Sequence, residues 1–369
     1  MISRLCLSDL HLGDDRSTLF SAEVVSKVVA SLAEISGGSI DTLILNGDVW
    51  EECVPSDMTL AEGLSRSVIS SSQFFFGQLF YQIKVGKVIY VPGNHDLCLW
   101  DWYARSKDLD SITSYAGQPV SLTDWPWRQL FARFDGELLV SYPLYHAAGQ
   151  DFPVLAFTHG HLLDPLVLGR DSEAEYAALA ALGCRRPNIS TETSVSKRAR
   201  LVHDFVLDLW RRYSSRDRIF ANYVMRRLLH PQSCLWQREI GLDGPHVLGD
   251  EYATDDQPPA GEGYMGSVTE FLDLMMLDTG LPSPVGDFGH VPGAAFTKPS
   301  CLVFGHDHLG ARKTVVSCGV PFHVVDSGGW TSEFDGHLPH CRALVWQKSE
   351  DVSPEVYFIR ARTKGGKIL

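Results

Sequence analysis

Three short apolar segments near the start of the chain each end directly in polar residues. Residues 2–7 run into Ser8-Asp9-Leu10-His11, residues 42–45 into Asn46-Gly47-Asp48, and residues 87–91 into Gly93-Asn94-His95-Asp96. Such short apolar runs predict buried strands, while the helical spacing of apolar side chains in 23–35 and 60–83 predicts helices between them. Alternating strands and helices favour an α/β fold. Because the carboxyl ends of its strands meet at one edge, the polar residues are expected to form one site.

Four further apolar segments extend this pattern into the rest of the chain. Residues 138–145, 154–158, 301–304 and 322–326 are strand candidates, and two of them again run into histidines. We expect two sheets packed face to face with helices outside. The 369 residues are interpreted as a single domain, 1–369, because the polar clusters lie on both sides of a central segment of different character. That segment, 162–298, is expected to be an inserted helical cap with an acidic loop.

Composition limits the classes of function. Nothing approaches the roughly 18 consecutive apolar residues of a membrane-spanning helix, so no transmembrane segment is expected. The first residues already form a predicted strand and leave no room for a signal peptide, which favours a cytoplasmic protein with reduced cysteines. A net charge of −13 argues against a protein that coats nucleic acid, because such proteins need a basic surface.

The charge of the insertion is unevenly distributed. Residues 184–240 contain twelve Lys or Arg and five Asp or Glu, whereas residues 241–297 contain ten Asp or Glu and no Lys or Arg. The predicted amphipathic helices 197–213 and 217–229 carry most of the arginines. Their basic faces are either solvated, or part of a lid that holds substrate phosphates through arginine. A third alternative is contact with an anionic membrane surface. The candidate substrate contacts are His161, Arg198, Arg212 and Arg216.

The strand-ending residues supply carboxylate, amide and imidazole ligands without thiolate. Such a set suits Mn, Fe, Zn, Ni or Co as a divalent ion, and we expect Mn²⁺ first. In an extended Asp-x-His segment the two side chains share a face, so Asp9 and His11 would point to the same centre. A carboxylate such as Asp48 can bridge two ions about 3.5–4 Å apart, a pair that activates water for attack on phosphorus.

In order, the blocks are Asp9-Leu10-His11, Gly47-Asp48, Gly93-Asn94-His95-Asp96, His159 and Gly305-His306-Asp307-His308. This set resembles the calcineurin-like metallophosphoesterase superfamily, whose pattern is DxH, GD, GNH[DE], H and GHxH. The resemblance covers residues 1–160 and 300–360 and implies a four-layer αββα sandwich with two metal ions. It implies that the first ion is held by Asp9, His11, Asp48 and His308. It implies that the second is held by Asp48, Asn94, His159 and His306.

The same resemblance implies a separate role for His95, which would protonate the leaving oxygen or stabilise transition-state charge. Asp96 and Asp307 are expected to orient their neighbours. We expect hydrolysis of a phosphodiester or pyrophosphate in a small molecule or lipid headgroup. Residues 47–51 and the helical insertion are similar to the UDP-2,3-diacylglucosamine pyrophosphatases, although GNHD here replaces their GNRD.

Three alternatives to this hydrolase remain open. A nuclease-type phosphodiesterase would need a basic track, which the net charge disfavours. A phosphomonoesterase or protein phosphatase is the second, although Trp50-Glu51-Glu52 stands where the protein phosphatases carry VDRG. A peripheral membrane-binding protein that uses the basic cap is the third.

Overall fold

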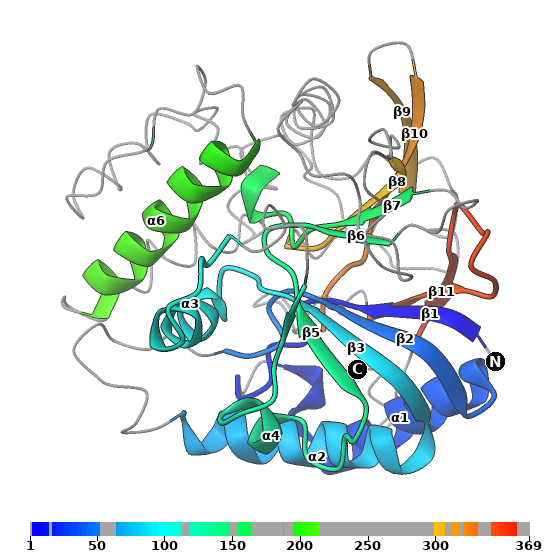
Figure 1. Ribbon diagram of the computed structural model, residues 1–369. Coiled ribbons are helices and arrows are strands. Elements are labelled where there is room, and N and C mark those ends of the chain that lie inside the picture. Colours follow the sequence, from blue (N-terminus) through cyan, green and yellow to red (C-terminus); the bar gives the residue numbers. More distant parts are fainter. Residues whose placement is uncertain are drawn as a thin grey trace, which may run out of the picture.

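The chain folds into an α/β sandwich of two mixed sheets, as expected (Figure 1). The computed structural model describes residues 2–14, 17–51, 64–112, 119–147, 154–163, 187, 195–214, 299–306, 312–317, 320–330 and 341–359. Within these ranges, no helix combines the length and the apolar composition needed to cross a lipid bilayer. Of the insertion 162–298, the description covers residues 162, 163, 187 and 195–214, so its limits stay a prediction.

The first sheet has seven strands in the order β12-β11-β1-β2-β3-β5-β4. Strands β1, β2, β3 and β5 run parallel, and β4, β11 and β12 pair antiparallel with their neighbours. Their bounds are β1 Ile2–Leu7, β2 Ser39–Asn46, β3 Lys84–Val91, β4 Val120–Ser121, β5 Glu137–Val140, β11 Arg342–Trp346 and β12 Glu355–Phe358.

The second sheet has five strands in the order β6-β7-β8-β10-β9. Its central strands β7, β8 and β10 run parallel, and β6 and β9 pair antiparallel at its edges. Their bounds are β6 Tyr145–Ala147, β7 Val154–Phe157, β8 Pro299–Phe304, β9 Arg312–Ser317 and β10 Val320–Asp326.

The predicted single strand 138–145 is wrong. The chain forms β5 in the first sheet, leaves it at Ser141, and enters the second sheet as β6. Pro143 lies in this crossing and has no N–H to donate to a ladder, which explains why one continuous strand cannot form there.

The described helices have the bounds α1 Ala22–Ser36, α2 Arg66–Gln82, α3 Leu97–Ser106, α4 Trp127–Leu130 and α6 Val195–Ser214, with 3-10 turns η1 Thr18–Phe20 and η4 His161–Leu163. The predicted helix 23–35 is confirmed as α1, and residues 66–82 of the predicted helix 60–83 form α2. Residues 197–213 lie in α6 as expected, and residues 217–229 lie outside the described ranges.

Alternate residues of the central strands enter two different cores. On β1, Leu5 and Leu7 pack in the core that includes α1 and α2, while Cys6 packs in the core between the sheets. The same alternation places Leu43 with the helices and Ile44 between the sheets. Both faces of the parallel strands are therefore buried, which explains their continuous apolar sequences. Figure 1 shows α1, α2 and α4 along the outer face of the first sheet.

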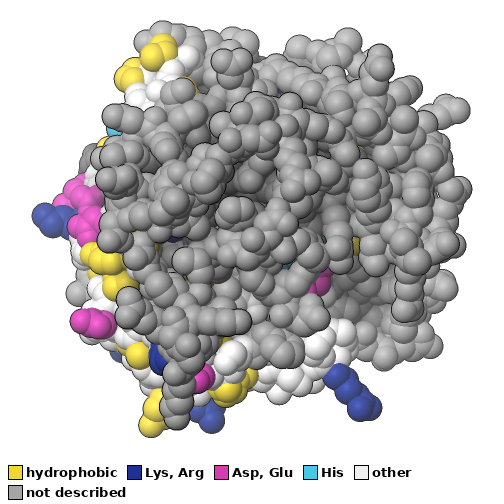
Figure 2. All heavy atoms as spheres, turned by 180° about the vertical axis from the view of Figure 1, so that it is seen from behind, with side chains coloured by type: hydrophobic (Ala, Val, Ile, Leu, Met, Phe, Trp, Pro, Cys, Tyr) yellow, Lys and Arg dark blue, Asp and Glu magenta, His cyan; other side chains and the backbone are white. Residues whose placement is uncertain are grey.

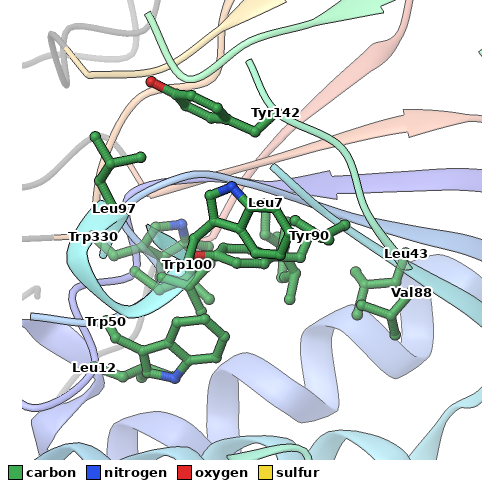
Figure 3. Packing of buried hydrophobic residues seen from close by; sticks show 14 of the residues in the cluster. Leu7, Leu12, Leu43, Trp50, Val88, Tyr90, Leu97, Trp100, Tyr142 and Trp330 are labelled. Carbon is green, nitrogen blue, oxygen red and sulfur yellow. The ribbon is translucent and has the colours of Figure 1, made fainter. Parts of the chain in front are cut away.

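Trp50 anchors the loop that follows β2. Its ring is fully buried and lies 5.1 Å from the ring of Tyr90 and 5.5 Å from that of Phe131. Its indole N–H donates to the Ser72 hydroxyl of α2 at 2.7 Å. Figure 3 shows Trp50 beside Leu12, from the loop after β1, with which it forms a parallel bridge. The loops that carry the polar clusters thus rest on a packed aromatic core.

Replacement of Ser72 by Ala should destabilise the protein through this anchor. The buried indole N–H of Trp50 would lose its acceptor, at a cost of about 1–3 kcal/mol in the free energy of unfolding. Urea unfolding measures this, with Ser70→Ala as the control because Ser70 is exposed on the same helix. Equal stabilities of the two variants would contradict this role of the hydrogen bond.

Candidate metal centre

The loops after β1, β2, β3, β7 and β8 bring six of the predicted ligands together in one buried cluster. The six side chains belong to residues at most 3% exposed, namely Asp9, His11, Asp48, Asn94, His159 and His306. The two sheets therefore contribute jointly, three loops from the first and two from the second. The seventh predicted ligand, His308, lies outside the described residues. We call these six residues together with His95 the Asp48 cluster.

Asp48 lies at the centre of the cluster. Its Oδ2 is 3.0 Å from Nε2 of His159, 3.8 Å from Nε2 of His11 and 4.0 Å from Nε2 of His95. Burial would raise the pKa of Asp48, but the surrounding imidazoles, His159 foremost, outweigh it and hold the pKa well below the usual range. The carboxylate is thus kept ionised in a buried site, as a metal ligand must be.

Two groups of side chains in this cluster could each hold a metal ion. One is His11, Asp48 and His95, and the other is Asp48, His159 and His306, with the ligand atoms of each within 4.8 Å of one another. Asp48 belongs to both groups. One carboxylate shared between two neighbouring sets of ligands is the arrangement that a bridging ligand requires.

The composition of the first group differs from the expected set in one respect. His95, expected as a separate proton donor, stands with His11 and Asp48, whereas Asp9 was expected there. Oδ1 of Asp9 accepts the backbone N–H of His306 at 3.0 Å, and its Oδ2 accepts the Ser8 hydroxyl. Asp9 therefore fixes the loop after β8, and the division of Asp9 and His95 between metal binding and proton transfer stays a prediction.

His159 and Asn94 direct their ligand atoms at one another. Nε2 of His159 lies 2.9 Å from Oδ1 of Asn94, and its Nδ1 lies 3.2 Å from the carbonyl oxygen of Asn46. A proton on Nδ1, donated to that carbonyl, leaves Nε2 as the metal-binding atom. Burial lowers the pKa of His159, but Asp48 and Asp9 outweigh it and raise the pKa to about 9.

Glu51 orients two histidines of the cluster, and the sequence alone did not indicate this role. Its Oε2 lies 2.9 Å from Nδ1 of His11, and its Oε1 lies 2.9 Å from Nδ1 of His95. Both imidazoles therefore turn Nε2 towards Asp48. Burial would raise the pKa of Glu51, but His95 and His11 hold it well below its usual range. The available signal was a carboxylate three residues after Asp48, in the same loop.

Asp96 joins the loop after β2 to the loop after β3, as expected of an orienting residue. Its carboxylate oxygens accept the backbone N–H of Val49 at 2.8 Å and that of Gly93 at 2.7 Å. Burial, and then the neighbouring charge of Asp48, raise the pKa of Asp96 to about 7. Asp307, for which the same role was expected, lies outside the described residues.

Four residues of the cluster have a left-handed backbone conformation, which residues other than glycine rarely adopt. The φ angles of Asp9, His11, Asp48 and His306 are 55°, 45°, 48° and 78°. Such left-handed conformations cost free energy and persist where the surrounding structure fixes them. Here they turn successive side chains into the cluster just after the strands end. The expected extended Asp9-Leu10-His11 segment is therefore wrong, because left-handed turns and not strand alternation direct these two side chains.

Two glycines leave room for this arrangement. Gly47 has a φ of 88°, and a Cβ there would overlap the ring of His159. At Gly93 the obstacle is Asp48, whose carboxylate and backbone N would overlap an added Cβ. Gly47 is therefore required by its positive φ, and Gly93 by its close approach to the central carboxylate.

The four predicted substrate contacts are described to different degrees. His161 is buried, stacks on Tyr142, and places Nε2 3.0 Å from the Tyr142 hydroxyl; burial keeps its pKa well below the usual value. Its ring lies 5.5 Å from that of His159. Arg198 is buried on α6. The side chain of Arg212 and the whole of Arg216 lie outside the described residues. Contact with a substrate stays a prediction for all four.

Comparison with known proteins adds no name to this geometry. No protein-family model matches the chain, and no curated protein matches it. The family resemblance of the five sequence blocks therefore stays a prediction.

Replacement of Glu51 by Gln should weaken metal binding without removing a ligand. An amide has no negative charge, so the charge-assisted hydrogen bonds that hold Nδ1 of His11 and Nδ1 of His95 weaken. Loss of such an outer partner costs about 10–100-fold in metal affinity. Calorimetric titration of metal-free protein with Mn²⁺ measures this, with the exposed Glu23→Gln of α1 as the control. Equal affinities of Glu51→Gln and wild type would exclude the role.

Metal binding should release a proton from His159. Below its pKa of about 9 this imidazole is protonated in the metal-free protein, whereas a metal-bound imidazole is neutral. The apparent affinity should therefore rise with pH between about 6.5 and 8, by up to about tenfold per unit. Titrations in buffers of different ionisation enthalpy count the released protons. A pH-independent affinity without proton release would contradict this.

Proposed function

We propose that the protein hydrolyses phosphoesters with two divalent ions bound in the Asp48 cluster. The observation that carries the proposal is the membership of Asp48 in both groups of metal-ligating side chains. A site for one structural ion has no use for two sets of ligands that share a carboxylate. Paired sets of this kind serve hydrolases, among them phosphatases and nucleases, and the resemblance of the five sequence blocks selects the phosphoester.

The donor atoms of the cluster fit the expected ions. Oxygen and imidazole nitrogen suit Mn²⁺, which we take as the first candidate, and also Fe, Zn, Ni or Co. Neither described group contains a thiolate. The nearby Cys6 and Cys301 lie in the core between the sheets, and burial raises the pKa of the Cys6 thiol well above its usual value. Cys6 and Cys301 therefore do not compete as ligands.

Three residues of the cluster, Asp9, Asp48 and His95, have separate parts in the proposed reaction. A pair of ions held by the two groups around Asp48 would activate water as the nucleophile and would stabilise charge on the phosphoryl oxygens. Asp48, with Asp9, supplies the negative charge that keeps the ions in place. His95 holds Nδ1 against Glu51, so its Nε2 faces the cluster, where it can complete the first group of ligands or, if Asp9 takes that place, pass a proton to the leaving oxygen. The burial of these groups excludes bulk water and strengthens each electrostatic interaction.

We infer a small phosphodiester or pyrophosphate, free or as a lipid headgroup, as the substrate. The basic segment 184–240 follows His159 in the sequence, and its described helix α6 packs against α3, which begins directly after the cluster. Arginine from this insertion can bind phosphate oxygens with two parallel hydrogen bonds. A nucleic-acid substrate is less favoured. The net charge of −13 argues against it, and in Figure 2 blue and magenta side chains lie side by side among the few described residues of that face.

Purified protein loaded with Mn²⁺ should cleave bis-p-nitrophenyl phosphate, and Asp48→Asn should reduce the rate to background. An amide at this position lacks the charge needed to hold two ions. Asp41→Asn is the matched control, because Asp41 is exposed on the same strand β2. Absorbance of p-nitrophenolate gives the rate. The proposal fails if the metal-loaded protein is inert on every mono- and diester tested.

A further inference from the structure

Helix α6 of the insertion lies antiparallel to α3. Arg200 contacts Asp110 at 2.6 Å, just beyond the end of α3, and His203 lies 3.4 Å from Asp101 within it. As the numbers rise along α6, those of the partners fall. Figure 1 shows the two helices beside each other. Continued in this direction, α6 reaches the loop that precedes α3. This loop contains Asn94 and His95 of the Asp48 cluster.

At that end of α6, Trp210 touches the cluster directly. Its buried indole N–H donates to the backbone carbonyl of Asn94 at 2.7 Å. Its ring lies 5.4 Å from the imidazole of His95, edge to face at 74°. A buried indole N–H needs an acceptor, and an aromatic pair in this geometry is favourable. The two contacts therefore fix both the backbone and the side chain of this loop.

Both sides of one peptide group are held in this way. The carbonyl of Asn94 and the N–H of His95 belong to the same peptide unit. The N–H donates to Oδ1 of Asp48 at 2.8 Å, and the carbonyl accepts from Trp210. Hydrogen bonds at opposite ends of one peptide polarise it and strengthen each other. The plane of this peptide, which sets the direction of the Asn94 and His95 side chains, is thus held between the Asp48 carboxylate and Trp210 of α6.

We propose that Trp210 is a positioning residue of the metal centre. It holds the peptide between Asn94 and His95 so that Asn94 Oδ1 and His95 Nε2 point into the cluster. The inserted segment is then a working part of the centre at this point and not only a cover over it. The kinetic consequence rests on the proposed function, but the structural consequence exists in the metal-free protein.

The test compares Trp210→Phe with Trp102→Phe. Phenylalanine at 210 keeps a ring beside His95 but has no N–H for the Asn94 carbonyl. Trp102 of α3 is the matched control, because its ring packs on the ring of Trp125, with the centroids 5.5 Å apart, and not on the cluster. Three readouts are taken: thermal unfolding, the amide proton of His95 by NMR in metal-free protein, and kcat and KM with Mn²⁺ and bis-p-nitrophenyl phosphate.

We expect the His95 amide proton to shift upfield and to exchange on the order of tenfold faster in Trp210→Phe, as its bond to Asp48 weakens. We expect kcat to fall by a similar factor, with a smaller change in KM. Trp102→Phe should change neither. An unchanged amide and unchanged kcat in Trp210→Phe overturn the proposal. The proposal is also overturned if kcat and the His95 amide change in both variants in proportion to their loss of thermal stability.

Two further outcomes are distinguishable. If wild-type protein is inactive but the His95 amide responds to Trp210→Phe, the proposed function fails and the positioning role holds. If Trp210→Phe does not fold, hydrogen exchange in wild-type protein decides. The amide of His95 and those of residues 206–210 should then open together, with one free energy, under mild denaturant. Independent opening of His95 overturns the proposal.

Discussion

The buried carboxylate of Asp48 is the constraint on which the rest of the centre depends. A charge removed from water costs several kcal/mol unless partners compensate it. Three imidazoles within 4.0 Å and the backbone N–H of His95 provide that compensation. Every strand end of the cluster must therefore deliver its side chain to one point. The fold is best understood as the frame that makes this convergence possible.

Two features of the frame achieve the convergence. The parallel strands place their carboxyl ends together, and backbone hydrogen bonds continue beyond them. The N–H groups of Asp9 and His11 donate to the carbonyls of Gly47 and Asp48, each at 2.9 Å. Left-handed backbone at Asp9, His11 and Asp48 then turns the chain within one or two residues. The conformational cost is offset by the aromatic packing around Trp50 and by the carboxylate bonds of Asp96.

Much of this centre was predictable from the sequence, because its signals are local. A short apolar run followed by Asp9-Leu10-His11 or by Gly47-Asp48 predicts both a strand and the residue at which it ends. The helical spacing of apolar residues predicts α1 and α6. The break between β5 and β6 was missed because apolar character continues through 138–145 while the hydrogen-bond partners change. Strands β4, β9, β11 and β12 were missed as well. Sequence pattern contains little information on which sheet a strand joins.

The roles of Glu51 and Trp210 depend on contacts between distant parts of the chain. Glu51 was noted as a departure from a known motif, and its two histidine partners lie 40 and 44 residues away. Trp210 lies in the predicted amphipathic helix 197–213, but that pattern could not show its acceptor, which lies 116 residues earlier. Periodicity predicts that a face is buried but not what covers it. His95 within the first metal group is a third case.

The most direct measurement of the central claim is anomalous diffraction from crystals of the protein soaked in Mn²⁺. Two peaks flanking the Asp48 carboxylate are predicted, one towards His11 and the other towards His159 and His306. A single peak, or peaks that do not share Asp48, would contradict the account.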